Sequence, residues 1–139
     1  MRLPRLPSGW SYSPIKRVVD LRFSAVDKHS FSEEQAVRLC NYVDVYRNER
    51  ITPNLGFMSA TATPGEVARF TVRPGDVLLT KDSETPDDIG VPAVVAEPLD
   101  AVLCGYHLAL LRPNQERVDG RFLHRALQER FPQAVINVI

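Results

Sequence analysis

The chain has 139 residues, of which 44% are hydrophobic and 24% are charged, enough apolar material for one domain with a real core and too much for a disordered chain. Its 17 basic and 17 acidic residues balance, which excludes a long-range positive field that would draw the whole protein onto nucleic acid or an anionic membrane. No apolar run approaches the roughly 18 to 20 residues needed to cross a bilayer, and no charged start followed by an apolar stretch marks a signal peptide. We therefore expect a cytoplasmic protein with no membrane partner.

The chain begins with an arm that contains two prolines. Prolines at positions 4 and 7, among arginines and apolar residues, indicate an extended arm over residues 1–9. Residues 10–23 are rich in apolar side chains and fit either a short helix or an entry strand. Residues 25–34 are polar, and we expect them to form a loop.

The clearest strand pattern lies at residues 37–46. Aliphatic and other side chains alternate there over ten residues, with many β-branched and aromatic members, which predicts a strand. One face of this strand would be aliphatic apart from Asn41. The other face would carry a mixed polar and aromatic set, namely Arg38, Tyr42, Asp44 and Tyr46. A turn over residues 47–50 is expected to follow.

A helix start is expected at Thr63. The sequence places a threonine at the capping position, Pro64 at the first helical position and Glu66 three residues after the cap, which is the signature of a helix N-terminus. We expect a short helix that ends near Phe70 and packs against the sheet.

Turn, strand and loop signals follow one another in the middle of the chain. Pro74 and Gly75 form a strong turn pair, so a buried strand should start near Asp76. The polar residues 80–88 then predict a long loop. A second apolar run, residues 93–96, predicts the next strand.

Two strand pieces are expected within residues 100–113, joined at Gly105. A glycine inside a strand pattern suggests either a bulge or a close approach of another backbone. A bulge at this position would re-aim Tyr106 and His107, which come directly after the glycine.

The chain is expected to close with a helix capped by Asp119. Its apolar residues recur at helical spacing, and Pro132 should stop it. The apolar residues 132–139 end without a polar cap, as the start of a truncated connector would. From this bare tail we expect the chain to self-associate or to be unstable alone.

Residue types that carry chemistry lack the spacing that would indicate a site. Cys40 and Cys104 stand alone in apolar segments, so we expect buried, reduced thiols. The three histidines are far apart, and no metal or cofactor is expected. Ser83, His107 and a nearby aspartate could be imagined as a nucleophilic set. No motif places that serine on a sharp turn, and catalysis is not expected from it.

Together these elements predict an α+β (mixed α/β) fold. We expect one globular domain over residues 1–139, with its core at about residues 10–130. It should contain a twisted, largely antiparallel sheet, short flanking helices and polar loops.

Four segments of the sequence carry a resemblance: VRLCNYVDVY at 37–46, RPGDVLLTKD at 73–82, GYHLALLRP at 105–113 and FLHRALQ at 122–128. In this order they resemble the target-recognition domain of a type I restriction-modification specificity subunit. The combination of RPGDVLLTKD with a following LALLRP is the most specific part. Such subunits have two recognition domains separated by long helices, and each domain reads one half of a split DNA site. With one domain and no long helix, the resemblance implies a half-subunit that pairs with itself or another chain, a fragment or a remnant.

The resemblance implies a noncatalytic module that recognises double-stranded DNA in a sequence-specific way. Methyltransferase (modification) and restriction subunits of the complex would hold the cofactor and the catalytic residues. Polar loops on a rigid sheet can reach base edges in the major groove. Because the chain is neutral, a partner must supply charge for phosphate binding. The candidate DNA-binding residues are Lys81, Ser83 and Glu84 in the loop, Tyr42 and Tyr46 on the strand face, Arg47, Asn48 and Arg50 in the next turn, and Tyr106 and His107 after the glycine.

Two other classes of function stay open. A degenerate or truncated protein-interaction module without DNA binding predicts a contiguous apolar patch on the surface. A small enzyme predicts a concave pocket on which titratable residues converge.

Overall fold

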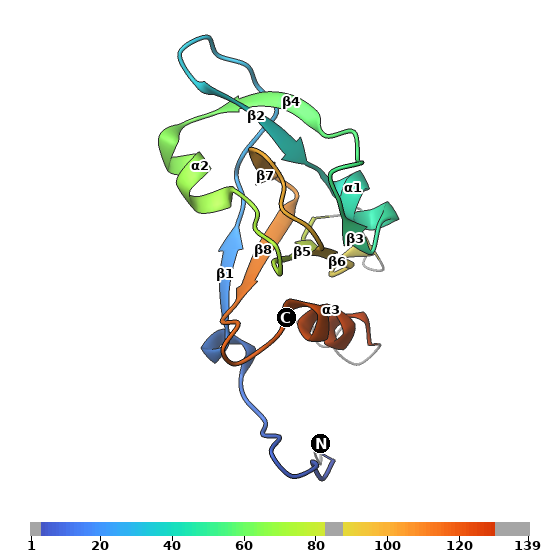
Figure 1. Ribbon diagram of the computed structural model, residues 1–139. Coiled ribbons are helices and arrows are strands. Elements are labelled where there is room, and N and C mark those ends of the chain that lie inside the picture. Colours follow the sequence, from blue (N-terminus) through green and yellow to red (C-terminus); the bar gives the residue numbers. More distant parts are fainter. Residues whose placement is uncertain (1–3, 83–87, 130–139) are drawn as a thin grey trace.

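The computed structural model describes residues 4–82 and 88–129, and its strands form two sheets (Figure 1). The five-stranded sheet has the order β1 (Val19–Phe23), β8 (Leu108–Pro113), β5 (Val77–Thr80), β6 (Pro92–Val95) and β3 (Arg50–Ile51). The three-stranded sheet has the order β4 (Met58–Ala62), β2 (Gln35–Cys40) and β7 (Val102–Cys104). The helical segments are η1 (Ile15–Arg17), α1 (Tyr42–Arg47), α2 (Pro64–Phe70) and α3 (Gly120–Gln128).

Most neighbouring strands run antiparallel, and short helices flank them. The pairs β1–β8, β5–β8, β5–β6 and β2–β4 are antiparallel, whereas β2–β7 and β3–β6 are parallel. The α+β fold class is therefore confirmed. The expectation of one sheet is corrected to two, because β2 pairs with β4 and β7 and has no pairing with the sheet that contains β5.

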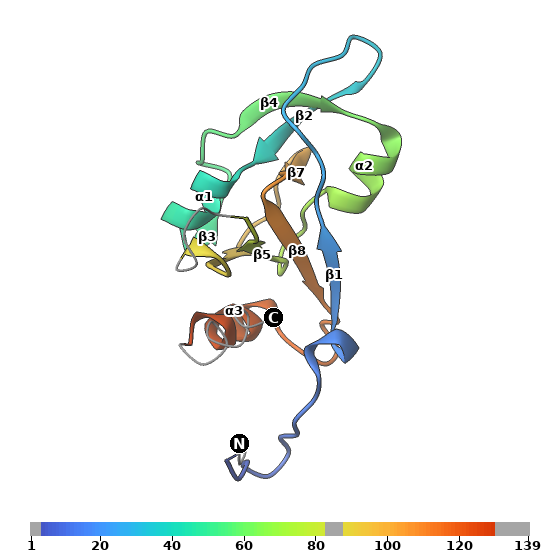
Figure 2. The same ribbon diagram turned by 180° about the vertical axis from the view of Figure 1, so that it is seen from behind.

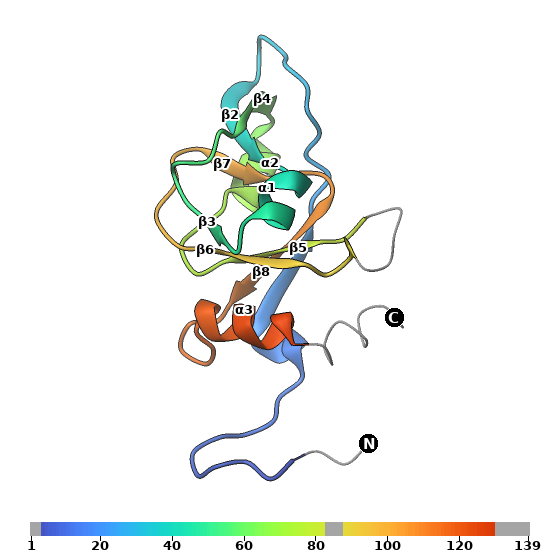
Figure 3. The same ribbon diagram turned by 90° about the vertical axis from the view of Figure 1, so that its right-hand side faces the viewer.

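The main core lies between the two sheets. It combines β2 and β7 from one sheet with β5, β6 and β8 from the other, through fully buried residues such as Leu39, Leu103, Leu78 and Leu110. Figure 3 shows the three-stranded sheet on one side of the five-stranded sheet and α3 on the other. Burying these aliphatic groups is the main favourable contribution to the stability of such a fold.

A second, smaller core lies where α3 covers the opposite face of the five-stranded sheet. Leu123 and Leu127 of α3 are buried there with Val77 of β5. The next residue of β5, Leu78, belongs to the main core, so this strand is apolar on both faces. Burial on both faces explains why β5 shows a continuous apolar run without alternation.

Both helix starts that the sequence indicated are present. At α2, the Glu66 backbone N–H donates to the Thr63 hydroxyl at 3.2 Å, and the Thr63 backbone N–H donates to the Glu66 carboxylate at 3.0 Å. At α3, the Asp119 carboxylate accepts from the Arg121 backbone N–H at 2.8 Å. Helix α3 ends at Gln128, and the expected stop at Pro132 and the connector lie outside the described residues. Within the described part of the chain, no helix is long and apolar enough to cross a membrane.

The N-terminal third contains a strand that the sequence left undecided. Residues 10–23 form η1 and then β1, and Figure 2 shows the chain from the N-terminal arm running up through both. Residues 25–34 form the expected loop without regular structure. Strand β4, with the sequence MSATA, was not predicted, because small residues give it no apolar alternation.

The turn at Pro74 and Gly75 is held by an ion pair between the buried Asp76 and the half-buried Arg112. Gly75 has φ +91°, which glycine adopts without strain. The Asp76 carboxylate accepts from the Arg73 backbone N–H at 2.7 Å and from Nε and Nη2 of Arg112 at 3.0 and 2.9 Å. The hydrogen bond to Asp76 also raises the pKa of Arg112. This pair therefore joins RPGDVLLTKD to LALLRP, the two most specific segments of the resemblance.

The two cysteines are buried side by side. Cys40 of β2 and Cys104 of β7 are partners in the parallel register, both are fully buried, and both are free thiols. Burial raises the pKa of each thiol above its usual value. The expectation of buried cysteines is confirmed, and their reduced state stays a prediction.

Candidate nucleic-acid interface

Residues 41–47 form a helix start and a helix, where the sequence pattern predicted a continued strand. Strand β2 ends at Cys40, and the Asn41 backbone N–H donates to the Asp44 carboxylate at 2.9 Å, which caps the start of α1. The strand prediction for residues 41–46 is therefore wrong, because a local cap and burial of Val45 outweigh the β preference of this valine- and tyrosine-rich stretch. An asparagine followed three residues later by an acid was the signal for this cap.

Helical spacing brings two of the candidate residues together. Tyr42 and Tyr46 lie one turn apart on α1, and their rings stack with centroids 5.6 Å apart. Tyr46 is exposed, and Asp88 raises its pKa through its charge and a hydrogen bond. The hydrogen bond of Tyr46 therefore links α1 to Asp88, the last residue of the predicted loop 80–88.

Gly105 starts a tight turn that carries the chain from one sheet to the other. The Gly105 backbone N–H donates to Cys40 O at 2.9 Å, and the Leu108 N–H donates to Gly105 O at 3.1 Å. A Cβ atom at Gly105 would lie 2.8 Å from both Cys40 O and Asn41 Oδ1. The close approach expected at this glycine is therefore confirmed. The alternative of a bulge is wrong, because β7 and β8 belong to different sheets.

The turn after Gly105 exposes two candidate residues. Tyr106 and His107 are both exposed, and their rings meet edge to face with centroids 4.9 Å apart. His107 Nδ1 lies 3.4 Å from Asp82 Oδ2, and the two side chains are 58% and 52% exposed. An exposed pair at this distance is weakly coupled, so both groups remain available to solvent.

Lys81 is held inward at the end of β5. Its ammonium donates to Ser24 O at 2.7 Å and lies 5.7 and 5.4 Å from the ring centroids of Phe23 and Tyr106. Its backbone N–H also donates to His107 O at 3.1 Å. Lys81 thus supports the turn that carries Tyr106 and His107. The other two loop candidates, Ser83 and Glu84, lie outside the described residues.

A groove of about 380 Å³ runs between the start of α1 and the turn after Gly105. It is lined by three of the candidates, Tyr42, Tyr106 and His107, and also by Lys28. Lys28 was not among the sequence candidates, although its position in the polar loop beside His29 was visible. Asp27 and Asp44 line it as well, so segments distant in sequence bring aromatic, imidazole, ammonium and carboxylate groups around one depression.

The three candidates from residues 47–50 lie apart from this groove. Arg47 is the exposed last residue of α1, and Asn48 Nδ2 donates to Asp44 O at 2.8 Å at the end of the helix. Arg50 begins β3 and lines a separate cavity of about 320 Å³ together with Arg121 of α3. The expected turn therefore divides between a helix end and a strand start.

The α+β arrangement that positions this groove occurs in solved structures. A chain from a structure on complex assembly and conformational transition of a type I R-M system matches with a TM-score of 0.55 and 19% sequence identity, over 92% of this chain and 31% of that chain. The HsdS subunit from Thermoanaerobacter tengcongensis matches with a TM-score of 0.55 and 18% identity, over 98% of this chain and 31% of that chain.

These matches establish a shared fold, and the present chain spans less than a third of the length of the chains that it matches. No known sequence family matches the chain, and no curated protein sequence matches it. The fold that the sequence resemblance implied is thereby confirmed.

Proposed function

We propose that this chain is a noncatalytic DNA-recognition module of the type I restriction-modification specificity class. It reads one half of a split double-stranded site for a complex of methyltransferase and restriction subunits. One observation of the site carries the proposal: Tyr42, Tyr106 and His107 come from two separate segments and surround one exposed groove beside Asp82, where the long polar loop begins. The fold shared with an HsdS subunit supports the same function.

The chemistry of the groove suits the edges of bases. A tyrosine hydroxyl and an imidazole can each donate and accept hydrogen bonds, and base edges in the major groove present both donors and acceptors. The backbones that carry these groups are fixed by the cap at Asn41 and by the close approach at Gly105. Rigid support of exposed polar groups is what sequence readout requires, because a mispositioned donor loses its discrimination.

The charges around the groove are mixed, which favours a partner that holds the phosphates. Lys28 lines the groove together with Asp27 and Asp44, and Asp82 lies beside it and pairs with His107. Nonspecific affinity for DNA scales with the number of phosphates that a protein neutralises. We therefore place the DNA-bound form in a complex, with methyltransferase and restriction subunits and with a second copy or second half-subunit of this chain.

Binding selection from a random duplex pool, with and without a methyltransferase partner, tests the proposal. The selected duplex is then compared with scrambled duplexes for His107→Ala and Tyr106→Phe. We expect each variant to lose about 1–3 kcal/mol on the selected duplex and to relax preference at one position.

Arg117→Ala serves as the matched control, because Arg117 is an exposed residue in the segment between β8 and α3 and lies outside the groove. Its removal should leave base preference unchanged. Failure to select any duplex in the presence of the partner would contradict the proposed function. A selected duplex that both groove variants bind as well as the unmodified chain would move the reading surface elsewhere.

A further inference from the structure

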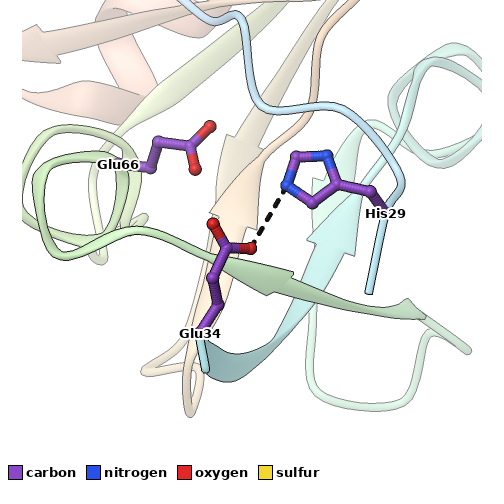
Figure 4. Close-up of side chains that lie close together, drawn as sticks. All are labelled: His29, Glu34 and Glu66. Atoms are coloured by element: carbon purple, nitrogen blue, oxygen red, sulfur yellow. Dashed lines mark ion pairs between the residues drawn. The ribbon is translucent and has the colours of Figure 1, made fainter. Parts of the chain in front are cut away.

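Three side chains with metal-binding chemistry meet at the outer end of the three-stranded sheet (Figure 4). His29 belongs to the loop between β1 and β2, Glu34 directly precedes β2, and Glu66 lies in the first turn of α2. One ligand atom of each residue lies within 4.8 Å of the other two, and His29 Nε2 is 3.3 Å from Glu34 Oε1. All three side chains are half-buried.

Hydrogen bonds from the following strand fix the backbones and the carboxylates of this group. The Thr61 hydroxyl donates to Glu34 Oε1 at 2.8 Å, and the Thr61 backbone N–H donates to His29 O at 2.9 Å. The capping hydrogen bond from Thr63 occupies Oε1 of Glu66 at 3.0 Å and leaves its second oxygen available. Partners of this kind orient ligands in metal sites.

The donor set and its spacing suit a zinc-like ion. Two carboxylates and one imidazole supply oxygen and nitrogen, which borderline divalent ions such as Zn²⁺ accept, whereas Ca²⁺ and Mg²⁺ prefer oxygen alone. Bonds of about 2.0–2.2 Å to a tetrahedral ion place ligand atoms roughly 3.4 Å apart. The pair His29 and Glu34 already has that spacing at 3.3 Å. Glu66 needs an approach on the order of 1 Å at most, which a side-chain rotation supplies.

We propose that His29, Glu34 and Glu66 bind one zinc-like divalent ion, with water as the fourth ligand. The ion fastens the 25–34 loop to the start of α2. Strand β2 leads from this end of the sheet towards α1 (Figure 1), but Lys28, which lines the groove of Tyr42 and Tyr106, directly precedes His29, so the ion and the groove share the 25–34 loop. With three protein ligands and one water, the ion keeps an open coordination position, which closed structural zinc sites lack.

Zinc titration of the full chain without a histidine tag tests the site. Glu66→Gln is the sharpest variant, because glutamine preserves the capping box at this position while removing the carboxylate ligand. Glu33→Gln is the matched control, since Glu33 is exposed and adjacent to Glu34 but outside the cluster. His29→Gln removes the imidazole.

We expect the unmodified chain and Glu33→Gln to bind one Zn²⁺ and to melt at a higher temperature in its presence. Glu66→Gln and His29→Gln should bind at least about tenfold more weakly and lose that rise in melting temperature. Co²⁺ should give the visible absorption of a four-coordinate ion only in the unmodified chain and in the Glu33→Gln control. Affinity should fall in acid, because protons compete for the ligands.

The proposal is overturned by the absence of saturable Zn²⁺ binding to the unmodified chain. Equal affinity of Glu66→Gln, His29→Gln and the unmodified chain overturns it as well, because the ion would then bind elsewhere. An equal rise in melting temperature with Mg²⁺ would also contradict the donor set. Melting each variant without metal shows separately whether it folds.

Discussion

The two ends of strand β5 carry aspartates of opposite exposure, one buried and one in solvent. Before the strand, the Asp76 carboxylate is buried, with the residue 1% exposed, and it bonds Arg112 and the backbone of Arg73. After the strand, the Asp82 side chain is 52% exposed, and it pairs with the equally exposed His107 at 3.4 Å. Only five residues, the four of β5 and Lys81, separate the two aspartates.

This difference divides the segment RPGDVLLTKD into two parts. The first part joins the turn to β8 through the ion pair of the buried Asp76 with the half-buried Arg112, so it contributes to the fold. The second part leads to the groove where candidate DNA-binding groups are exposed. The part of RPGDVLLTKD that contributes to the fold is therefore different from the part that should set base preference. Variants at Asp76 should lower stability, whereas variants at Asp82 should leave stability nearly unchanged.

Replacing Asp76 should have the largest effect on stability. Asp76→Ala leaves the Arg112 guanidinium without its buried partner, and we expect the free energy of unfolding to fall by about 3–5 kcal/mol. Chemical denaturation measures this change. Asp82→Ala is the matched control at the other end of the strand and should change stability by less than about 0.5 kcal/mol. Similar losses for both variants would remove the contrast between the two ends.

A methyl group at Gly120 should cost less, about 1–3 kcal/mol. A Cβ there would lie 2.1 Å from Gly75 O, so Gly120→Ala forces α3 away from the turn before Asp76. Thermal unfolding measures the loss. Gly65→Ala is the control, because Gly65 lies in α2, where an added Cβ would be 4.0 Å from Thr63 Oγ1. It should be neutral or stabilise the protein by up to about 1 kcal/mol, since alanine favours a helix.

Lys81→Met should lower the free energy of unfolding by about 1–2 kcal/mol, because a charge-assisted hydrogen bond to Ser24 O is lost. Preference for the selected duplex should also weaken, since the ammonium lies 5.4 Å from the Tyr106 ring and Lys81 supports the turn that carries this residue. Denaturation and duplex binding in the partner complex measure the two effects. An equal fall for selected and scrambled duplexes would instead indicate that Lys81 contacts a phosphate. Lys16→Met, at the exposed η1 segment, is the control.

The smallest effect should come from the pH dependence of His124. This buried residue lies with Nε2 3.3 Å from Pro92 O, and desolvation lowers its pKa. The unfolded chain therefore binds a proton more readily than the folded chain. Stability from this group is present above its unfolded pKa of about 6.5 and is lost as pH falls through the lower folded pKa.

Chemical denaturation of the unmodified chain and of His124→Gln between pH 7.5 and 5 measures this dependence. This range brackets the ordinary histidine pKa of roughly 6.5. The unmodified chain should lose more stability than the variant over that range. An equal slope for the two proteins would assign the pH dependence to other groups.

Local signals predicted the elements that local chemistry decides. The cap at Thr63 and the turn pair at Gly75 act within a few residues, and α2 and β5 were placed correctly. Helix α1 was missed because the alternation of valine and tyrosine continues past Cys40, where burial of Val45 and the Asp44 cap decide the conformation. Strand pairing was beyond reach, since β2 pairs with β7 across more than sixty residues, as Arg38 with Val102.

The candidate site was predicted in part. Tyr42, Tyr106 and His107 surround one groove even though Tyr42 lies on a helix, because the helix starts where the strand was expected to continue. Arg50 belongs to another surface, and Lys28 was missed. Both errors come from tertiary placement, which residue type and position in the sequence do not determine.

The pairing of β1 with β8 constrains how the chain reaches its native state. Val19 pairs with Pro113 and Phe23 with Ala109, so the first strand finds its only sheet partner near the end of the described chain. Contacts of such long sequence separation slow folding, towards the millisecond-to-second range of β-rich domains. During synthesis, residues 19–23 must therefore wait unpaired until β8 has left the ribosome. Until then the apolar Leu21 and Phe23 lie in an unpaired strand, the kind of segment that makes incompletely folded chains prone to aggregate.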